Sequence, residues 1–290
     1  MVFSVNSHLK GLLIAFFGIV ILTPDAVLVR LADSDSWTVL FWRGIFFAAG
    51  IIIILLITYR SKAVNELINI GKGGVLIGLL TALGGTSFIL AIHYTSIAKT
   101  LVIISISPIM VAIVSLIMLK EEPALYTWLS MIIVFIGIYI VMAGDKSGMN
   151  LMGNLFALTS VIVGGFSFTL LRKYKNVNMV PAMAVNGIAV ALIGFVFADS
   201  LVLSSQSMLY ILASGIVLAV SFSLITMAPQ YIPAPEVAMF FPLGTVLGTL
   251  LAWIVVKEQP SSNALIGGSI VIVTLFCHAW YSNKLAQNLK

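Results

Sequence analysis

Charged side chains are scarce in this sequence: Asp, Glu, Lys and Arg together make up 9% of its 290 residues. A soluble domain carries about 25% of such residues, so this chain has too few of them to cover a surface that faces water. Hydrophobic residues make up 61% of the chain, and its mean hydropathy is +1.16. These values predict a protein that is embedded in a lipid bilayer.

Cysteine and the common catalytic motifs are also scarce or missing. Cys277 is the single cysteine, which excludes an internal disulfide and a cysteine metal cluster. The sequence has no His-Glu-x-x-His motif and no Walker lysine loop, and we read Gly71-Lys-Gly-Gly as a loop turn. We therefore expect no enzyme activity, no cofactor and no metal. The net charge of +5 reports on membrane topology rather than on nucleic-acid binding.

The sequence contains one unit twice. Tyr94, Lys120, Glu121 and Pro123 recur as Tyr231, Lys257, Glu258 and Pro260, and each residue lies 137 positions from its counterpart, as in 231 − 94. A doubled apolar unit is typical of transport folds in which the substrate lies near the bilayer midplane between two repeats. We place the first repeat at 1–145 and the second at 146–290.

Ten apolar segments approach the roughly 20 residues that a helix needs to cross a bilayer. This predicts an all-α integral membrane protein with ten transmembrane helices. The first segment is too long for the apolar core of a signal peptide, so we read it as a retained span. The segments are 9–31, 36–58, 72–93, 98–119, 124–143, 151–172, 178–199, 207–228, 235–256 and 262–283.

The distribution of Lys and Arg between the loops predicts the orientation of these spans. With a cytoplasmic N-terminus, ten basic residues fall on the inner side and four on the outer side, which is the positive-inside pattern. Ten spans return the C-terminus to the cytoplasm, and the loops between them are short. Because each repeat holds five spans, an odd number, the second repeat enters the membrane in inverted orientation.

Several motifs resemble a known family. The string Ala91-Ile-His-Tyr-Thr-Ser-Ile-Ala-Lys-Thr, with Ser107-Pro108 and Leu119-Lys-Glu-Glu-Pro after it, is similar to the repeat of the drug/metabolite transporter superfamily, EamA type. The stretch 231–260 resembles the second copy, and the openings Thr23–Leu31 and Phe41–Gly44 resemble those of bacterial members. The resemblance implies ten helices and a central cavity lined mainly by the first, third and fourth helices of each repeat. It also implies a bacterial inner membrane and transport of small metabolites.

The resemblance does not name the cargo. Family members include amino-acid exporters, and others move nucleotide-linked, methyl-donor or cationic compounds. We expect a carrier that exports or exchanges amino acids or related compounds by alternating access. Uptake of a nucleotide-like or methyl-donor metabolite, or efflux of cationic drugs, is the alternative. A membrane scaffold or an intramembrane enzyme is the alternative outside transport, although the chain has neither large loops nor a visible nucleophile. A monomer suffices for this fold; a coupling proton and a dimer remain open.

Asp25 and Arg43 are the clearest ionisable pair within the spans. The first hairpin turns near Ser34, nine residues from each of them, so antiparallel helices bring both to a similar depth. We expect the two side chains to approach each other, either as a gate or proton-responsive pair or as a structural ion pair. The second repeat has Ser167 and Asn186 near these positions, which predicts an asymmetric cavity.

Three prolines interrupt predicted spans. Pro24, Pro108 and Pro242 remove the donor that would bond the carbonyl four residues earlier, so each predicts a kink. Kinks and freed carbonyls suit a helix that bends or binds polar cargo, although neighbouring helices can also satisfy a static kink. Small polar residues near them, above all Ser105 and Ser107, are candidates to contact substrate or to join helices.

Two further pairs occupy equivalent repeat positions. Lys99 and Glu236 carry opposite charge, and inversion puts Lys99 near the outer mouth and Glu236 near the inner mouth. They either steer a charged metabolite or extend to the interface. Tyr94 and Tyr231 either cap the cavity or belong to the interfacial aromatic belt. Phe88, Phe222 and Phe240 are candidate apolar walls; His93 either titrates or packs at the interface, while His8 and His278 lie near the ends of the chain.

Overall fold

The computed structural model describes residues 5–143, 150–256 and 262–288. All regular secondary structure within these residues is helical, which confirms the expected all-α class. The helices are, in chain order, α1 (Val5–Leu22), α2 (Asp25–Leu31), α3 (Ser36–Tyr59), η1 (Arg60–Lys62), α4 (Ala63–Asn69), α5 (Gly71–Tyr94), α6 (Ile97–Ile104), α7 (Ser107–Leu119), α8 (Leu125–Ala143), α9 (Leu151–Lys173), α10 (Ala182–Phe197), α11 (Ser205–Met227), η2 (Ala228–Gln230), α12 (Ala234–Ala238), α13 (Phe241–Val256) and α14 (Ser262–Asn288).

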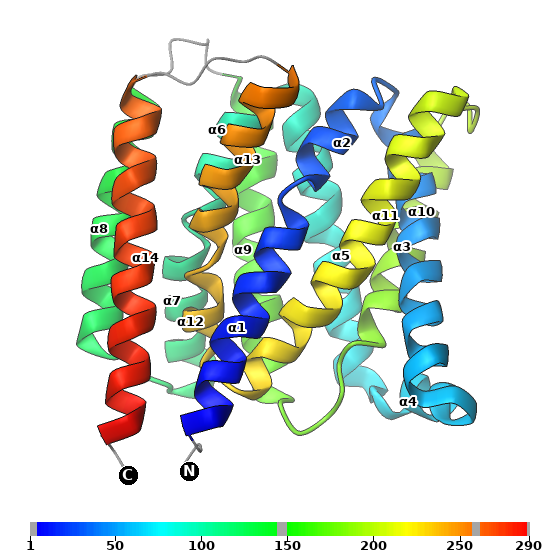
Figure 1. The fold of residues 1–290 in the computed structure, drawn as a ribbon. Helices are drawn as coiled ribbons and strands as arrows, with labels where there is room; N and C mark the ends of the chain where they lie inside the picture. Colours follow the sequence, from blue (N-terminus) through cyan, green and yellow to red (C-terminus); the bar gives the residue numbers. More distant parts are fainter. Residues whose placement is uncertain (1–4, 144–149, 257–261, 289–290) are drawn as a thin grey trace.

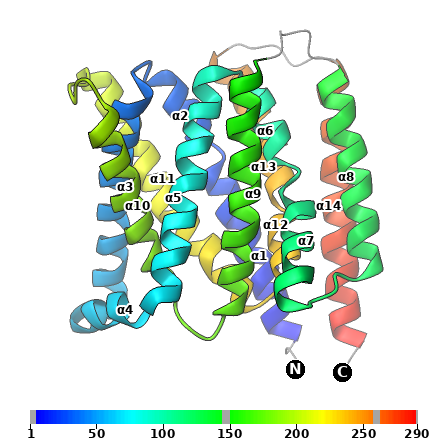
Figure 2. The ribbon, with the colours of Figure 1, turned by 180° about the vertical axis from the view of Figure 1, so that it is seen from behind.

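These helices make ten crossings of the membrane. Eight helical segments among the described residues are long and apolar enough to span it, and Leu125–Gly137 and Ala182–Phe197 are shorter apolar helices. Both termini lie on one side of the bundle, which we call the terminus side; the opposite side is the far side (Figure 1). The helix α1 leaves the terminus side whereas α9 returns to it, so the two repeats are inverted (Figures 1 and 2). The boundary predicted at 145/146 lies outside the described residues.

Two details differ from the sequence-based expectation. The seventh crossing begins at Ala182 rather than at 178. The side-chain Oδ1 of Asn178 accepts a hydrogen bond from the backbone N of Val180 at 3.2 Å, and Pro181 then caps the helix. The connection after the second crossing is also not a simple short loop, because it forms η1 and α4 on the terminus side.

Proline breaks three crossings into two helices each. The first crossing changes from α1 to α2 at Thr23-Pro24, and the fourth changes from α6 to α7 at Ser105-Ile106. The ninth changes from α12 to α13 at Met239-Phe240. Proline has no backbone N–H and its ring clashes with the preceding turn, so the three kinks expected from sequence are confirmed as breaks.

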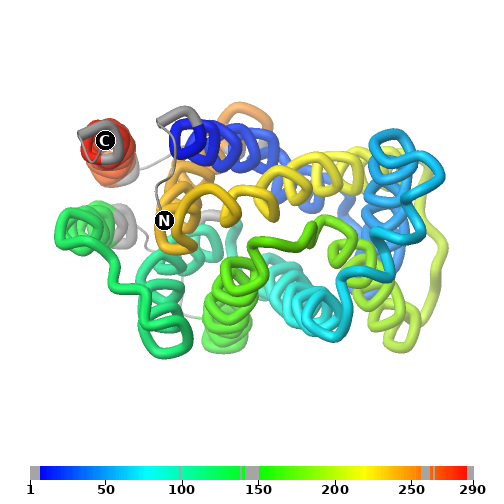
Figure 3. The backbone as a smooth tube through the Cα atoms, turned by 90° about the horizontal axis from the view of Figure 1, so that it is seen from below, coloured from blue at the N-terminus to red at the C-terminus, as the bar shows by residue number. Residues whose placement is uncertain are grey.

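The second helices of the two repeats, α3 and α10, pack together at one end of the bundle, and α8 and α14 pack together at the other end (Figure 3). At the α3–α10 contact, Gly44 and Gly187 face each other. A Cβ added to Gly44 meets the carbonyl O of Gly187 at 2.6 Å, and one added to Gly187 meets the carbonyl O of Gly44 at 2.8 Å. The reciprocity means that equivalent glycines of the inverted repeats meet near a local two-fold axis.

Gly44→Ala is expected to destabilise the folded protein by about 1–3 kcal/mol, because the added methyl group overlaps backbone that belongs to another helix. Its Cβ would lie 2.5 Å from the backbone N of Ala191. Gly85→Ala is the matched control, because a Cβ there meets nothing within 4 Å. Thermal unfolding in detergent measures both; equal melting temperatures for the two variants would contradict the expected clash.

Candidate functional site

A cavity of about 180 Å³ lies between the two repeats. Its lining residues come from the first four crossings of each repeat, and among the described residues none lies on α8 or α14. The second helix of each repeat contributes as well as the expected first, third and fourth: Arg43 lies on α3 and Asn186 on α10. The cavity is therefore enclosed by eight crossings, while the fifth helix of each repeat stays outside it.

Aromatic side chains form much of the apolar wall. The candidates Phe88 and Phe222 both line the cavity. Phe168 and Phe241 line it too, with ring centroids 5.3 Å apart in an edge-to-face arrangement. Phe240, at the break between α12 and α13, packs instead in the buried core around α1, whereas its neighbour Phe241 lines the cavity. Aromatic pairs of this kind are rigid surfaces for an apolar part of a substrate.

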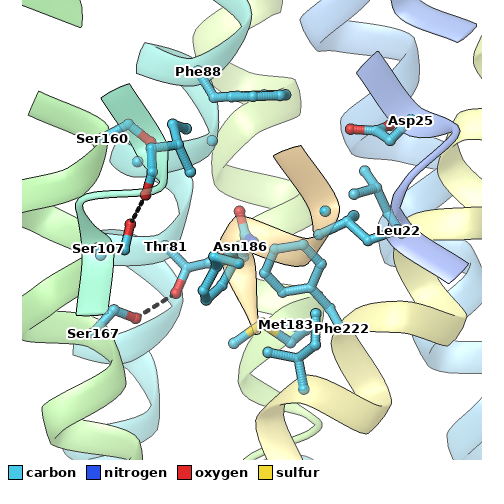
Figure 4. Close-up of a pocket in the computed structure, with 18 of the residues that line it drawn as sticks. Leu22, Asp25, Thr81, Phe88, Ser107, Ser160, Ser167, Met183, Asn186 and Phe222 are labelled. Atoms are coloured by element: carbon cyan, nitrogen blue, oxygen red, sulfur yellow. Dashed lines mark hydrogen bonds between the residues drawn. The ribbon is translucent and has the colours of Figure 1, made fainter. Parts of the chain in front are cut away.

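A cluster of small polar side chains lies across the cavity from Asp25 (Figure 4). Thr81 Oγ1 and Ser167 Oγ are 2.7 Å apart and share a hydrogen bond. Asn186 and Ser160 also line the wall. Thr226 Oγ1 is buried and has no hydrogen-bond partner within the part of the chain that the structure describes. An unpaired buried hydroxyl in a cavity wall is a ready contact for a polar substrate.

Asp25 and Arg43 form a buried ion pair at the cavity wall. Arg43 Nη2 donates to Asp25 Oδ2 at 2.6 Å, and Arg43 Nε lies 3.4 Å from Asp25 Oδ1. Ser214 on α11 joins them: its Oγ donates to Asp25 Oδ1 at 2.5 Å and accepts from Arg43 Nε at 3.2 Å. The expected approach of the two charges is confirmed. Their link to Ser214, in the second repeat, could not be read from spacing.

The carbonyls freed by proline are already partly used. Ser107 Oγ donates to the carbonyl O of Ile104 at 2.5 Å, so the hydroxyl replaces the donor that Pro108 lacks (Figure 4). Ser105 Oγ donates to the carbonyl O of Val102 at 2.5 Å. Of these candidates only Ser107 lines the cavity. Pro108 and Pro242 lie near the starts of α7 and α13, where the second helix of each broken crossing begins.

On the terminus side, Arg172 binds together three separate elements. This residue at the end of α9 is buried, and its Nη1 donates to the carbonyl O of Pro229 at 2.8 Å and to that of Ile232 at 3.3 Å. Its Nε lies 3.2 Å and 3.3 Å from the two carboxylate oxygens of Glu121, which follows α7. This network links the ends of α7 and α9 to the η2–α12 segment.

The far side holds the repeat counterpart of this contact. Arg30 Nη1 donates to the carbonyl O of Ile92 at 3.5 Å, and Pro229 lies 137 residues after Ile92, which is the repeat offset. Arg30 is exposed, whereas Arg172 is buried. The same pair of positions is thus tightly packed on the terminus side and loose on the far side.

The remaining candidates lie away from the cavity. Tyr94 is exposed and stacks on Phe156, as an interfacial aromatic residue does. Lys99 is half-buried near the start of α6 on the far side. Tyr231 lies on the terminus side, with Lys10 Nζ 4.7 Å from its ring centroid. Glu236 is buried rather than exposed at a mouth, and His8 Nε2 lies 3.1 Å from its Oε2.

The sequence pattern of the EamA-like transporter family matches residues 8–143 and 151–279, one match for each half of the bundle. The chain belongs to the EamA-like transporter family. The family and the ten crossings together make it a multi-pass membrane transporter of small molecules. They point away from an enzyme.

Two similar proteins add detail. An "Uncharacterized transporter" from Methanothermobacter thermautotrophicus is 22% identical over 228 residues, which cover 73% of this chain and 66% of the relative. A solved structure titled "Crystal structure of protein" has a TM-score of 0.75 at 16% identity, covering 97% of this chain and 98% of that one. At this identity the solved structure supports the fold alone.

Proposed function

We propose that this EamA-like transporter is a secondary carrier that exports or exchanges small amphipathic metabolites by alternating access, with amino acids and their derivatives as the first candidates. The observation that carries this proposal is the composition of the cavity. Asp25 and Arg43 place opposite charges on one side, and hydroxyl and amide groups lie on the other. The rings of Phe88 and Phe222 line the space between them (Figure 4). This set of groups matches a zwitterion with an apolar side chain better than it matches a polycation, because the one carboxylate of the described lining already pairs with an arginine.

The two arginines support an alternating cycle. Arg172 holds the terminus side closed, and exposed Arg30 belongs to a looser far side. In an inverted-repeat carrier the two halves exchange their packing when access alternates. We propose that this structure is closed toward the terminus side, and that Arg172 releases its carbonyl partners when that side opens.

The termini face the cytoplasm of a bacterial inner membrane in this proposal. Arg60, Lys62 and Lys72 are exposed on the terminus side, at the ends of crossings. Basic residues collect in cytoplasmic loops. The far side is then the periplasmic side.

Counterflow in proteoliposomes tests the proposed transport. Vesicles are loaded with a mixture of unlabelled neutral amino acids and receive the same compounds labelled outside. Saturable accumulation of label in vesicles with the carrier, and none in empty vesicles, is expected. A pH gradient is applied in parallel to detect coupling. If folded protein exchanges no amino acid but exchanges nucleotide-like, methyl-donor or cationic compounds, the substrate class proposed here is wrong.

A further inference from the structure

A second buried acid–base pair lies outside the cavity, between the first and the ninth crossing. His8 on α1 and Glu236 on α12 are each 7% exposed, and His8 Nε2 lies 3.1 Å from Glu236 Oε2. Ser282 Oγ on α14 donates to the same carboxylate oxygen at 3.1 Å. Three helices that are remote in sequence therefore meet at one carboxylate.

The pair is completed by polar groups of α8 and α14. Tyr126 Oη donates to Ser282 Oγ at 3.2 Å, and Ser282 Oγ also lies 3.4 Å from His8 Nε2. His8 Nδ1 is buried without a hydrogen-bond partner in the described residues. The contacts Tyr126–Ser282–Glu236–His8 therefore form one continuous chain, in which the carboxylate of Glu236 and the imidazole of His8 are the groups that can bind a proton.

Charge balance determines how many protons the buried pair of Glu236 and His8 holds. A carboxylate taken out of water is strongly destabilised unless a positive group neutralises it or it binds a proton. An ionised Glu236 beside a neutral imidazole is the unfavourable case, because its negative charge is then not neutralised. One proton on either Glu236 or His8 gives a neutral carboxylic acid with a neutral imidazole, or an ion pair. The buried pair is therefore stable when it holds one shared proton.

Other ionisable groups on the surrounding helices have partners of their own. Lys10, two residues after His8 in α1, lies over the ring of Tyr231, and Lys284 lies over the ring of Trp280. His278 Nε2 lies 3.4 Å from Thr127 Oγ1, and the His278 ring is close enough to Glu236 and His8 for their charges to interact. Arg172 on α9 is held by Glu121 and by the carbonyls of Pro229 and Ile232. His8 is thus the basic group in salt-bridge contact with Glu236.

Only the second repeat has a proton-binding acid at this position. Lys99 lies 137 residues before Glu236 and so occupies its position in the first repeat. The far-side end of the fourth crossing carries a lysine, which stays charged at physiological pH, whereas the terminus-side end of the ninth carries a group that can bind a proton beside a histidine. The α12 helix that holds Glu236 leads directly into the break and to Phe241 at the cavity wall.

We propose that His8 and Glu236 form a proton-binding site whose occupancy controls opening of the terminus side. With the proton bound, the neutral pair stays buried and links α1 of the first repeat to α12 and α14 of the second. Loss of the proton leaves a buried carboxylate, which favours the state in which α12 moves and Glu236 reaches water. Because the proton binds the two states with different affinity, its binding and the opening are linked. This inference rests on the proposed alternation but not on the nature of the cargo.

The test follows terminus-side opening without a substrate. Ile232→Cys, at a fully buried position on the terminus side, is built in a Cys277→Ser background. A membrane-impermeant maleimide then labels this cysteine across a pH series. Rates are normalised to those of an exposed cysteine at Ser61, which corrects for the pH dependence of the thiol reaction. The normalised rate is expected to rise with pH in the parent protein, and Glu236→Gln is expected to abolish that rise.

Glu122→Gln is the matched control, because it makes the same chemical change at an exposed carboxylate next to the Arg172 network. It should keep the full pH response. His8→Gln removes the basic partner but leaves Glu236, so it should shift the response to a different pH, which keeps the test valid if Glu236→Gln does not fold. An unchanged pH response in folded Glu236→Gln and His8→Gln overturns the proposal. If Glu236→Gln loses the pH response while the parent protein shows no amino-acid counterflow, the proposed proton site is supported and the proposed cargo is rejected.

Discussion

Arg43→Ala is expected to destabilise the folded protein by about 3–5 kcal/mol, because it leaves a buried carboxylate without its counter-charge. Asp25 is 3% exposed, and Ser214 alone would then remain as its partner among the contacts described above. Transport should fall as well, since the unpaired charge lies at the cavity wall. Thermal unfolding in detergent and counterflow in vesicles measure the two effects on the same preparation.

A double-mutant cycle separates charge from packing. Asp25→Asn with Arg43→Gln removes both charges while it keeps polar groups of similar size, so the double variant should be more stable than the sum of the two single losses predicts. Asp33→Asn is the control, because it neutralises an exposed aspartate in the first hairpin. If both single variants melt and transport like the parent, the pair has neither a structural nor a gating role.

The double variant also tells the two readings of this pair apart. A purely structural ion pair predicts that a stable Asp25→Asn/Arg43→Gln protein transports normally. A gate or a substrate contact predicts a stable protein that transports poorly. The geometry supports the second reading, since both residues belong to the cavity lining and bridge to Ser214 of the other repeat.

Much of the fold was predictable from sequence because its signals are local or periodic. Apolar segments of spanning length, the 137-residue offset and three prolines predict ten crossings, the inverted repeats and the breaks. The approach of Asp25 and Arg43 followed from equal distances to one tight turn. The start of α10 was missed because Asn178 and Pro181 form a turn within an otherwise apolar stretch.

The contacts between the repeats were not predictable from spacing. His8 looked like a residue near a chain end, yet it meets Glu236 at a separation of 228 residues. Ser214 meets Asp25 at a separation of 189 residues. Only the packing of helices sets such contacts, and no local pattern encodes them. Arg172 did carry a signal, because it aligns with Arg30 in the repeat, but the signal did not reveal which carbonyls it would bind.

Arg172→Gln is expected to open the terminus side. The substitution removes the charge from donors that hold two backbone carbonyls and Glu121. A hydrogen bond to a charged group contributes about 1.5–3 kcal/mol, so even one lost bond shifts the balance between closed and open states by roughly tenfold, using about 1.4 kcal/mol per factor of ten. The expected readout is faster maleimide labelling of Ile232→Cys in the Cys277→Ser background.

Arg30→Gln is the matched control for this prediction, because it makes the same change at the equivalent position of the other repeat. Arg30 is exposed, and its Nη1 lies 3.5 Å from the carbonyl O of Ile92. The free-energy difference between the closed and open states of the terminus side should therefore depend little on Arg30. Labelling at position 232 should therefore stay at the parent rate in Arg30→Gln while it rises in Arg172→Gln. Labelling at the parent rate in both variants would mean that the η2–α12 segment is held by apolar packing in the core cluster of Leu12 and Ala228, and that Arg172 is not the gate. A rise in both would mean that the two ends are coupled through the repeats rather than closed independently.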